Sequence, residues 1–309
     1  MDFVGKRKWF FIFSAILILV GVVSMSISPR FKVGIEFEGG SALSLTFAQA
    51  VDEDRLRSAM SDLGHGQAVV QRVGDTGVLI RTTTLEGPGN DGGVSERDAI
   101  EERLTEEFGT IEISELSAVS EAVAKETIRN AGIAVGVAAL FIMIYISFAF
   151  RLMANSMRLG VAAIVAALHD VIITLGAFSI LGKVVDLEVN AMFITGILTV
   201  VGYSVHDTIV VFDRIRENTA RRVSRDMSTT INISIMETIG RSLTTSLTTL
   251  TVIVALLLMG GGTIESLLYT LLIGVIVGTY SSIAIASQLL LVWEERGMNP
   301  FRRREEAEA

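Results

Sequence analysis

The sequence VGYSVHDTIVVFDRIREN, residues 201–218, directly follows AMFITGILTV, residues 191–200, which carries no charge. Together the two stretches contain an apolar run long enough to cross a bilayer, which takes about 20 residues of helix. This run nevertheless contains His206 and Asp207, and Asp213 follows about two turns later. Ionisable side chains within a membrane span are costly and commonly mark a functional site. The stretch therefore predicts a membrane protein with a functional carboxylate inside one of its helices.

The composition of the whole chain agrees with several membrane spans. Half of the 309 residues are hydrophobic and the mean hydropathy is +0.55, which is unusually apolar for a soluble domain. The first apolar segment follows the basic cluster GKRK and has no signal-peptidase site after it, so we interpret it as a retained anchor. We expect six transmembrane helices, the first at residues 9–27 and the others within 131–293, at 131–150, 159–181, 191–212, 243–259 and 266–293.

The basic residues of the short loops predict the orientation, because cytoplasmic loops are enriched in Lys and Arg. Fifteen of them lie in the N-terminal residues 1–8, after the second span, in the loop 213–241 and in the charged tail 294–309. Lys183 is the only one in the two short loops of the opposite side. We therefore expect a multi-pass protein with both termini in the cytoplasm.

Residues 28–130 then lie outside the cytoplasm, and their pattern predicts a small folded domain. SALSLTFA alternates like a strand, VDEDRLRSAMSDLG is helix-like, and GDTG is a turn signal between two further strands. A second helix is expected from the N-cap Ser95 to Gly109, followed by the strand TIEISELSAV. The order β-α-β-β-α-β predicts a ferredoxin-like α+β extracytoplasmic domain between the first two transmembrane helices.

Several classes of function are disfavoured by what the sequence lacks. It has no cysteine, so disulfides and thiolate chemistry are excluded. Residues 30–129 carry 10 basic and 19 acidic residues, which argues against nucleic acid as a partner. There is no G-x-x-x-x-G-K-[ST] loop for nucleotide phosphates, and three scattered histidines do not predict a metal site. We expect no enzyme activity, no metal and no bound cofactor.

Four stretches make the chain resemble the SecF family of bacterial protein-export membrane proteins, part of the resistance-nodulation-division superfamily. GIEFEGG, residues 34–40, is similar to the family's G-[IL]-D-F-x-G-G, with Glu36 where Asp is usual. ALHDVIITLG, residues 167–176, is similar to its third span. VGYSVHDTIVVFDRIREN is similar to its fourth span, where Asn is common at the position of His206. RSLTTSLTTL, residues 241–250, is similar to the start of its fifth span.

The resemblance implies a subunit that pairs with SecD beside the SecYEG channel and assists late translocation of preproteins. The expected location is the bacterial cytoplasmic (inner) membrane, among membrane lipids. The resemblance also implies that the proton gradient drives the work, with Asp207 and Arg241 in the proton relay. Because they follow the first span directly, four residues are the expected junction between outer domain and membrane: Gly34, Glu36, Gly39 and Gly40.

Asp207 is also singled out by its expected depth in the membrane. It lies six residues before Asp213, about 9 Å along a helix, so an interfacial Asp213 places Asp207 inside the hydrocarbon. Burial there penalises the charged carboxylate, so charged and neutral forms both become accessible, as a proton carrier requires. Arg241, at the start of the fifth span, is the natural counter-charge. It shares one helical face with three hydroxyl residues: Thr244, Thr245 and Thr248. Such a face can line a wet path for the proton relay or hydrogen-bond a neighbouring helix, so Thr245 and Thr248 are candidates for either role.

Other polar residues of the spans have more than one interpretation. His206 points about 100° away from Asp207 around the helix, which favours a structural or interfacial role over a proton role. His169 and Asp170 are candidates for the relay or for hydrogen bonds between helices. Two G-x-x-x-G pairs predict close helix packing: Gly132 with Gly136, and Gly274 with Gly278.

The energy of a single proton suggests the stoichiometry. One charge that moves through 100 mV yields about 2.3 kcal/mol. Driving a two-state element from 1:99 to 99:1 needs about 5.5 kcal/mol. We therefore predict more than one proton per cycle, or a smaller energy gap between the states. Sodium is an alternative coupling ion, since a carboxylate with Ser and Thr neighbours can bind it.

Three alternative functions stay open at the level of sequence. One alternative is a proton-coupled small-molecule efflux subunit of the same superfamily. Such transporters normally have twelve spans, so a chain with six would need a partner. An intramembrane hydrolase would use the two His-Asp pairs, but the chain lacks H-E-x-x-H and G-x-S-x-G. A non-catalytic assembly scaffold would tolerate Asp207→Asn, whereas a proton carrier would not.

Overall fold

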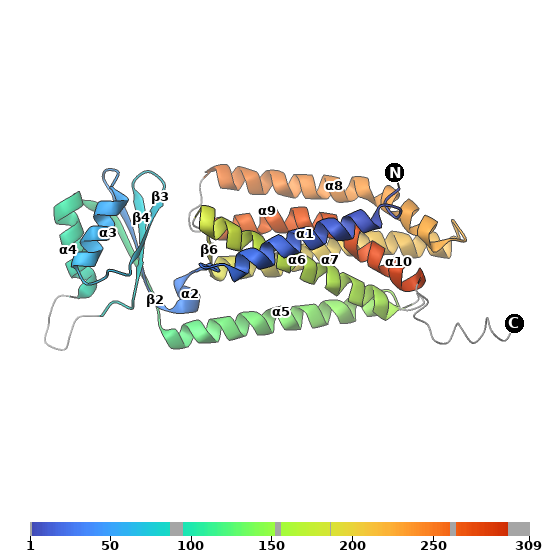
Figure 1. The fold of residues 1–309 in the computed structure, drawn as a ribbon, viewed down its shortest axis with the longest axis horizontal. Coiled ribbons are helices and arrows are strands. Elements are labelled where there is room, and N and C mark those ends of the chain that lie inside the picture. Colours follow the sequence, from blue (N-terminus) through green and yellow to red (C-terminus); the bar gives the residue numbers. More distant parts are fainter. Residues whose placement is uncertain (1, 87–94, 152–155, 186, 260–263, 296–309) are drawn as a thin grey trace.

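The computed structural model describes residues 2–86, 95–151, 156–185, 187–259 and 264–295. Within these ranges six helical segments are long and apolar enough to cross a membrane, which confirms the predicted number. In Figure 1 they run side by side, and an α+β domain lies beyond one end of the bundle. The segments are α1 (Arg7–Ser26), α5 (Glu121–Ala149), α6 (Ser156–Val184), α7 (Ala191–Ala220), α8 (Met227–Met259) and a sixth made of α9 (Glu265–Ser281), the π-helical segment η2 (Ser282–Ala286) and α10 (Ser287–Glu295).

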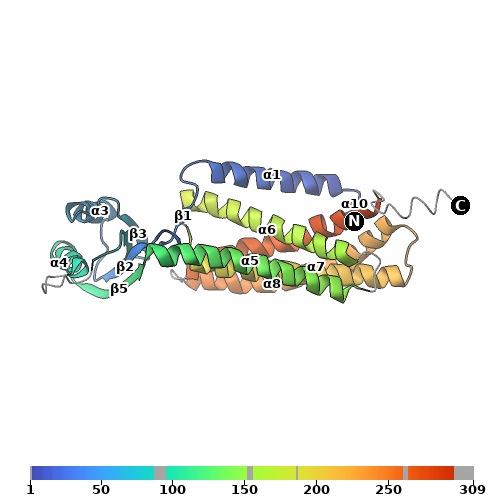
Figure 2. The same cartoon turned by 90° about the horizontal axis from the view of Figure 1, so that it is seen from below.

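The helices differ in how deeply they lie in the bundle. Between 50 and 61% of the most apolar window is buried in α6, α7 and the sixth segment, against 6 to 17% in α1, α5 and α8. The first three therefore form the centre, and the other three present apolar faces outward, as helices in contact with lipid do. Figure 2 shows α1 and α8 on opposite sides of the bundle.

The connection between α7 and α8 is shorter than expected. Residues 213–241 were predicted as a loop, but α7 continues to Ala220 and α8 begins at Met227. Ion pairs support these polar helix ends: Arg216 lies 2.6 Å from Asp213, and Arg214 Nε lies 2.6 Å from Glu237 of α8. The charged residues after the fourth span therefore extend and join two helices.

Small residues let α7 and α9 approach closely. A Cβ atom on Gly274 would lie 2.1 Å from Val200 Cγ2, and one on Gly278 would lie 3.1 Å from Ser204 Cβ. This G-x-x-x-G pair packs as predicted. The other pair does not, because a Cβ on Gly132 or Gly136 of α5 would meet no described atom within 4 Å. α5 is mostly exposed, so these glycines lie at its open face.

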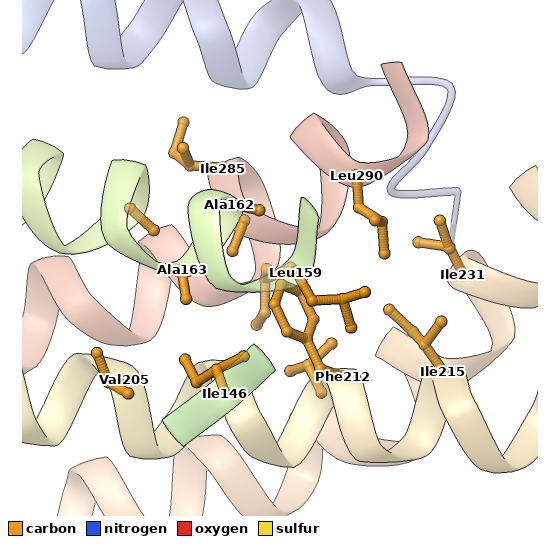
Figure 3. Packing of buried hydrophobic residues seen from close by; sticks show 14 of the residues in the cluster. Ile146, Leu159, Ala162, Ala163, Val205, Phe212, Ile215, Ile231, Ile285 and Leu290 are labelled. Atoms are coloured by element: carbon orange, nitrogen blue, oxygen red, sulfur yellow. The ribbon is translucent and has the colours of Figure 1, made fainter. Parts of the chain in front are cut away.

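Apolar side chains fill the half of the bundle farther from the α+β domain. Figure 3 shows Leu159 of α6, Phe212 of α7 and Leu290 of α10 packed together, with Ile146 of α5 and Ile231 of α8 around them. All five side chains are buried. Buried members of this cluster come from five spans, and Phe11 of α1 packs against them.

The α+β domain is built on a four-stranded antiparallel sheet. Its strand order is β3-β4-β2-β5, and its helices lie on the side of the sheet that faces away from the bundle (Figure 1). The predicted N-cap Ser95 accepts a hydrogen bond from the Asp98 N–H, and Gly109, with φ of 95°, ends the helix. The elements in chain order are β2 (Gly40–Phe47), α3 (Glu53–Asp62), β3 (Val69–Val73), β4 (Gly77–Thr82), α4 (Glu96–Phe108) and β5 (Ile111–Val119).

The junction between α1 and this domain contains structure that the sequence did not predict. A short strand, β1 (Lys32–Val33), pairs in parallel with β6 (Glu188–Val189), which precedes α7. A single helical turn, α2 (Ile35–Glu38), follows; Gly34 is its N-cap and Glu36 lies within it. Gly39 and Gly40 then turn the chain into β2 with φ of 80° and 117°, values that favour glycine.

Candidate functional site

Asp207 lies near the middle of α7, and its side chain is buried. Its two carboxylate oxygens have separate hydrogen-bond partners. Oδ1 accepts from Ser242 Oγ of α8 at 2.6 Å, and Oδ2 accepts from Ser282 Oγ in the sixth segment. Three helices therefore converge on this carboxyl group.

Arg241 does not pair with Asp207 in this structure, contrary to the expectation. Successive residues of a helix point about 100° apart, so Ser242 faces the core and Arg241 is exposed. Thr245 and Thr248 share the outward face of α8, and their hydroxyls donate to carbonyls of their own helix, at 2.9 Å for Thr245 and Arg241 O. The threonine face therefore lies on the outside of this chain.

Asp170 is a second buried carboxylate, and it is completely inaccessible on α6. Its Oδ1 lies 2.8 Å from Nδ1 of its neighbour His169. Its Oδ2 accepts from Ser281 Oγ at 2.7 Å and from Ser204 Oγ of α7. His169 Nε2 is also buried, and no hydrogen-bond partner for it lies in the described part of the chain.

His206 takes no part in either cluster. Its side chain is exposed on α7, on a different face from Asp207. Within the described ranges, no three His, Cys, Asp or Glu side chains gather as metal ligands would. In the described residues, the two His-Asp pairs therefore do not form a common set of metal ligands.

The serines that hold the two carboxylates were missed from the sequence. Each is a small polar residue in an apolar run, a signal too common to single out a site. The one available hint was spacing, because Ser242 and Ser246 lie four apart in RSLTTSLTTL and both prove to be buried. The serines in contact with the carboxylates are Ser204, Ser242, Ser281 and Ser282.

The chemistry of the two clusters suits the uptake and release of a proton. A buried carboxylate needs a partner for its charge, yet no Lys or Arg side chain of the described helices is buried beside either one. A hydroxyl group can both donate and accept. The serines can therefore bond to either the charged or the neutral form of each carboxyl group.

A further polar contact joins the α+β domain to the membrane helices. Arg81 of β4 lies 2.6 Å from Glu188 of β6 and donates to Val33 O of β1 at 3.2 Å. The Arg81–Glu188 contact is an ion pair, and among the described residues Glu188 Oε1 has no hydrogen-bond partner. Burial raises the pKa of the Glu188 carboxyl above its ordinary 4.5, although Arg81 acts in the opposite direction. Ser266 at the start of α9 completes the contact by donating to Glu188 O at 2.8 Å.

In the ranges that the structure describes, six apolar helices surround buried, hydroxyl-bonded carboxylates, which defines a multi-pass membrane protein with ionisable groups at its centre. Residues 99–296 match the model of the family described as protein export membrane protein SecD/SecF, C-terminal. The chain is 39% identical to the protein translocase subunit SecF of Thermobaculum terrenum, over 100% of this chain and 99% of that one. The chain therefore belongs to the SecF family of protein-export membrane proteins.

Two longer relatives extend the comparison. The protein translocase subunit SecDF of Bacillus subtilis is 34% identical over 96% of this chain but only 38% of its own length. The crystal structure of SecDF from Thermus thermophilus, a translocon-associated membrane protein, superimposes with a TM-score of 0.81 at 33% identity. That match covers 96% of this chain and 39% of the SecDF chain. The chain thus spans about two fifths of the SecDF proteins it resembles.

Proposed function

We propose that this protein, paired with SecD, assists late translocation of preproteins across the bacterial inner membrane beside the SecYEG channel. Family membership supports the role in export. The SecDF relatives, in which the matching part is one portion of a longer chain, support SecD as the partner. No observation specifically favours a small-molecule efflux role.

Protons are the proposed coupling ion, and Asp207 is the proposed primary site. The observation that supports this most is that Asp207 is buried near the centre of the bundle and that, in the part of the chain the structure describes, only hydroxyl groups donate to it. Protonation would remove the charge, and the serines would rearrange around the neutral acid. Since Ser242 already contacts Asp207, α8 would have to rotate or shift to bring the neighbouring Arg241 inward as its counter-charge.

The proposed orientation places both termini in the cytoplasm and the α+β domain outside. In Figure 1, α1 begins and α10 ends at the end of the bundle opposite the α+β domain. The connection between α7 and α8, with Arg221, Arg222 and Arg225, lies at that same end. This clustering of basic residues at one end supports the orientation. The element and strand orders of the domain support a ferredoxin-like fold for it.

The proposal is tested by export of a reporter preprotein into membrane vesicles that hold this chain, SecD and SecYEG. Wild type is compared with Asp207→Asn under a pH gradient and then under a sodium gradient. Asp213→Asn is the matched control, because it makes the same change at an exposed position of the same helix. We expect Asp207→Asn to lose the gradient-dependent part of export, about tenfold or more, and the control to keep it.

The outcomes separate the candidate functions. Dependence on the sodium gradient would replace the proton with sodium. Full export by Asp207→Asn with an intact complex would favour an assembly scaffold. Export that does not depend on this chain, together with gradient-dependent release of small molecules, would favour an efflux subunit.

A further inference from the structure

Asp170 is as central in α6 as Asp207 is in α7. It lies 14 residues after the start of α6 and 14 before its end, about 21 Å from either. The Lys and Arg residues of α6 itself lie near its ends, as Arg158 does, and Glu121 lies at the start of α5. Asp170 is therefore a carboxyl group in the middle of a span, and its hydrogen-bond partners among the described residues are two serines and one histidine.

The titratable groups that face Asp170 come from few elements. From its own helix it has His169, and α9 contributes Tyr280, whose ring stacks on His169 with centroids 6.3 Å apart. The Tyr280 hydroxyl does not donate to Asp170, since it donates to Phe10 O of α1 at 2.8 Å. α7 contributes Asp207, reached through the serines described next. No Lys or Arg of α1, α5, α8 or the sixth segment is buried within the described residues.

Two consecutive serines connect the carboxylates. Ser281 donates to Asp170, and Ser282 donates to Asp207. Adjacent Cα atoms are about 3.8 Å apart, so the two sites share one short piece of backbone. Each serine also lies within hydrogen-bond reach of a carbonyl of its own helix, 3.2 Å for Ser281 to Gly278 O and 3.0 Å for Ser282 to Thr279 O. Each hydroxyl can therefore donate either to an aspartate carboxylate or to a carbonyl of its own helix.

The backbone at this point is itself unusual. The sixth segment changes from α-helix to the π-helical segment η2 at Ser282. Such segments are rare and are often found at functional sites. Polar side chains bond its widened turn: Ser287 Oγ donates to Ser282 O at 2.8 Å, and Gln288 Nε2 donates to Ile283 O at 3.3 Å. Because Ser287 and Gln288 belong to α10, a movement of the backbone at Ser282 would therefore also displace α10.

We propose that Asp170 is a second proton-binding carboxyl group, coupled to Asp207 through Ser281 and Ser282. When either aspartate takes up a proton, the neutral acid donates to its serine, and the serine hydroxyl turns to its helix carbonyl. Because the two serines are adjacent, a change in the hydrogen bonds of one serine alters the hydrogen bonds of the other. Protonation of one aspartate therefore affects protonation of the other, and the two titrations are coupled. This inference rests on the proposed proton-driven function and supplies a second proton, which is one of the two ways of meeting the energy of switching.

His169 provides a route for the proton to Asp170. A carboxylate only accepts, so Nδ1 carries the hydrogen while Asp170 is charged, and Nε2 is left as a buried acceptor. A hydronium ion that reaches Nε2 gives up a proton there and leaves as water, and the Nδ1 proton passes to Asp170 Oδ1. A turn of the carboxyl group about its Cβ–Cγ bond then brings the acid proton to Ser281 Oγ, which contacts Oδ2 in the charged form. The imidazole is then neutral again and the carboxylate has become a neutral acid, so that charge and protons balance.

The test counts protons taken up by the full chain together with SecD in liposomes, using infrared difference spectra of carboxyl groups across a pH titration. We expect Asp170→Asn and Asp207→Asn each to lose one titrating carboxyl band relative to wild type. Asp213→Asn should leave both bands in place. If Asp207→Asn removes a band and Asp170→Asn does not, the second site is wrong while the proposed function stands. If neither variant removes a band, both are wrong.

A milder pair of variants tests the coupling and guards against misfolding of Asp170→Asn. Ser281→Ala keeps both carboxyl groups but removes a donor to Asp170 next to Ser282. We expect it to move the titration midpoints of both bands. Thr270→Val is the matched control on α9, because that buried hydroxyl donates only to its own helix, to Ser266 O. Movement of the Asp170 band alone would overturn the coupling through the serine pair.

Discussion

At the scale of single residues, neighbours in the sequence differ sharply in their surroundings. Asp207 is buried and bonded to two serines, whereas His206 beside it is exposed. The same contrast separates Ser242 from Arg241 on α8. One residue of rotation, about 100°, decides which side chain enters the core.

His206→Asn should leave export nearly unchanged, within about twofold of wild type. The reason is that the exposed side chain contacts neither carboxylate cluster, so its replacement removes no buried interaction. Initial rates of reporter export in vesicles would measure this. Asp207→Asn in the same assay provides the contrast. A loss from His206→Asn comparable with that from Asp207→Asn would place the histidine in the relay after all.

At the scale of elements, the crossing of α7 and α9 depends on glycine. A Cβ on Gly274 would overlap Val200, whereas one on Gly132 would extend into open space. We expect Gly274→Ala to destabilise the helix bundle by about 1–3 kcal/mol, as overpacking typically does. Gly132→Ala is the matched control and should be tolerated.

Thermal unfolding of the purified chain in detergent would compare the two glycine variants. A lower midpoint for Gly274→Ala alone is the expected result. Equal midpoints for both variants and wild type would show that α7 and α9 adapt to the added methyl group. A loss of stability in Gly132→Ala only within the SecD complex would indicate that the open face of α5 is covered there.

At the scale of the whole molecule, Arg81 and Glu188 hold the α+β domain against the membrane helices. A cleft of about 750 Å³ beside them is lined by residues of both parts, among them Arg72 and Tyr269. Burial raises the pKa of Glu188 above 4.5 in the docked arrangement. A domain that swings away would return Glu188 to water and to its ordinary pKa.

The docked arrangement should therefore gain stability as the external pH falls. It binds more protons than the undocked one between about pH 4.5 and the raised pKa of Glu188. The added stabilisation is fully present below that window and is lost as the pH rises through it. Spin labels on α3 and near the end of α6 would report the distance between the two parts. Glu188→Gln cannot titrate, and a pH dependence that persists in this variant would contradict the prediction.

The orientation can be tested directly, because the chain has no cysteine of its own. Asp75→Cys in the α+β domain should react with a membrane-impermeant maleimide added outside intact cells. Ser224→Cys, between α7 and α8, should react only after the membrane is opened. Reaction of both sites in intact cells, or the reverse order, would contradict the proposed orientation.

The sequence by itself determined the number of spans and the elements of the α+β domain, and it pointed to Asp207. These features depend on local patterns: apolar length, alternation, helix caps and a charge inside an apolar run. Periodicity along one helix says little about its rotation against another. Only the tertiary structure placed Ser242, Ser281 and Ser282 on the carboxylates, because those contacts join residues 35, 111 and 75 positions apart. The same uncertainty in rotation explains why Arg241 was expected inside the bundle and lies outside it.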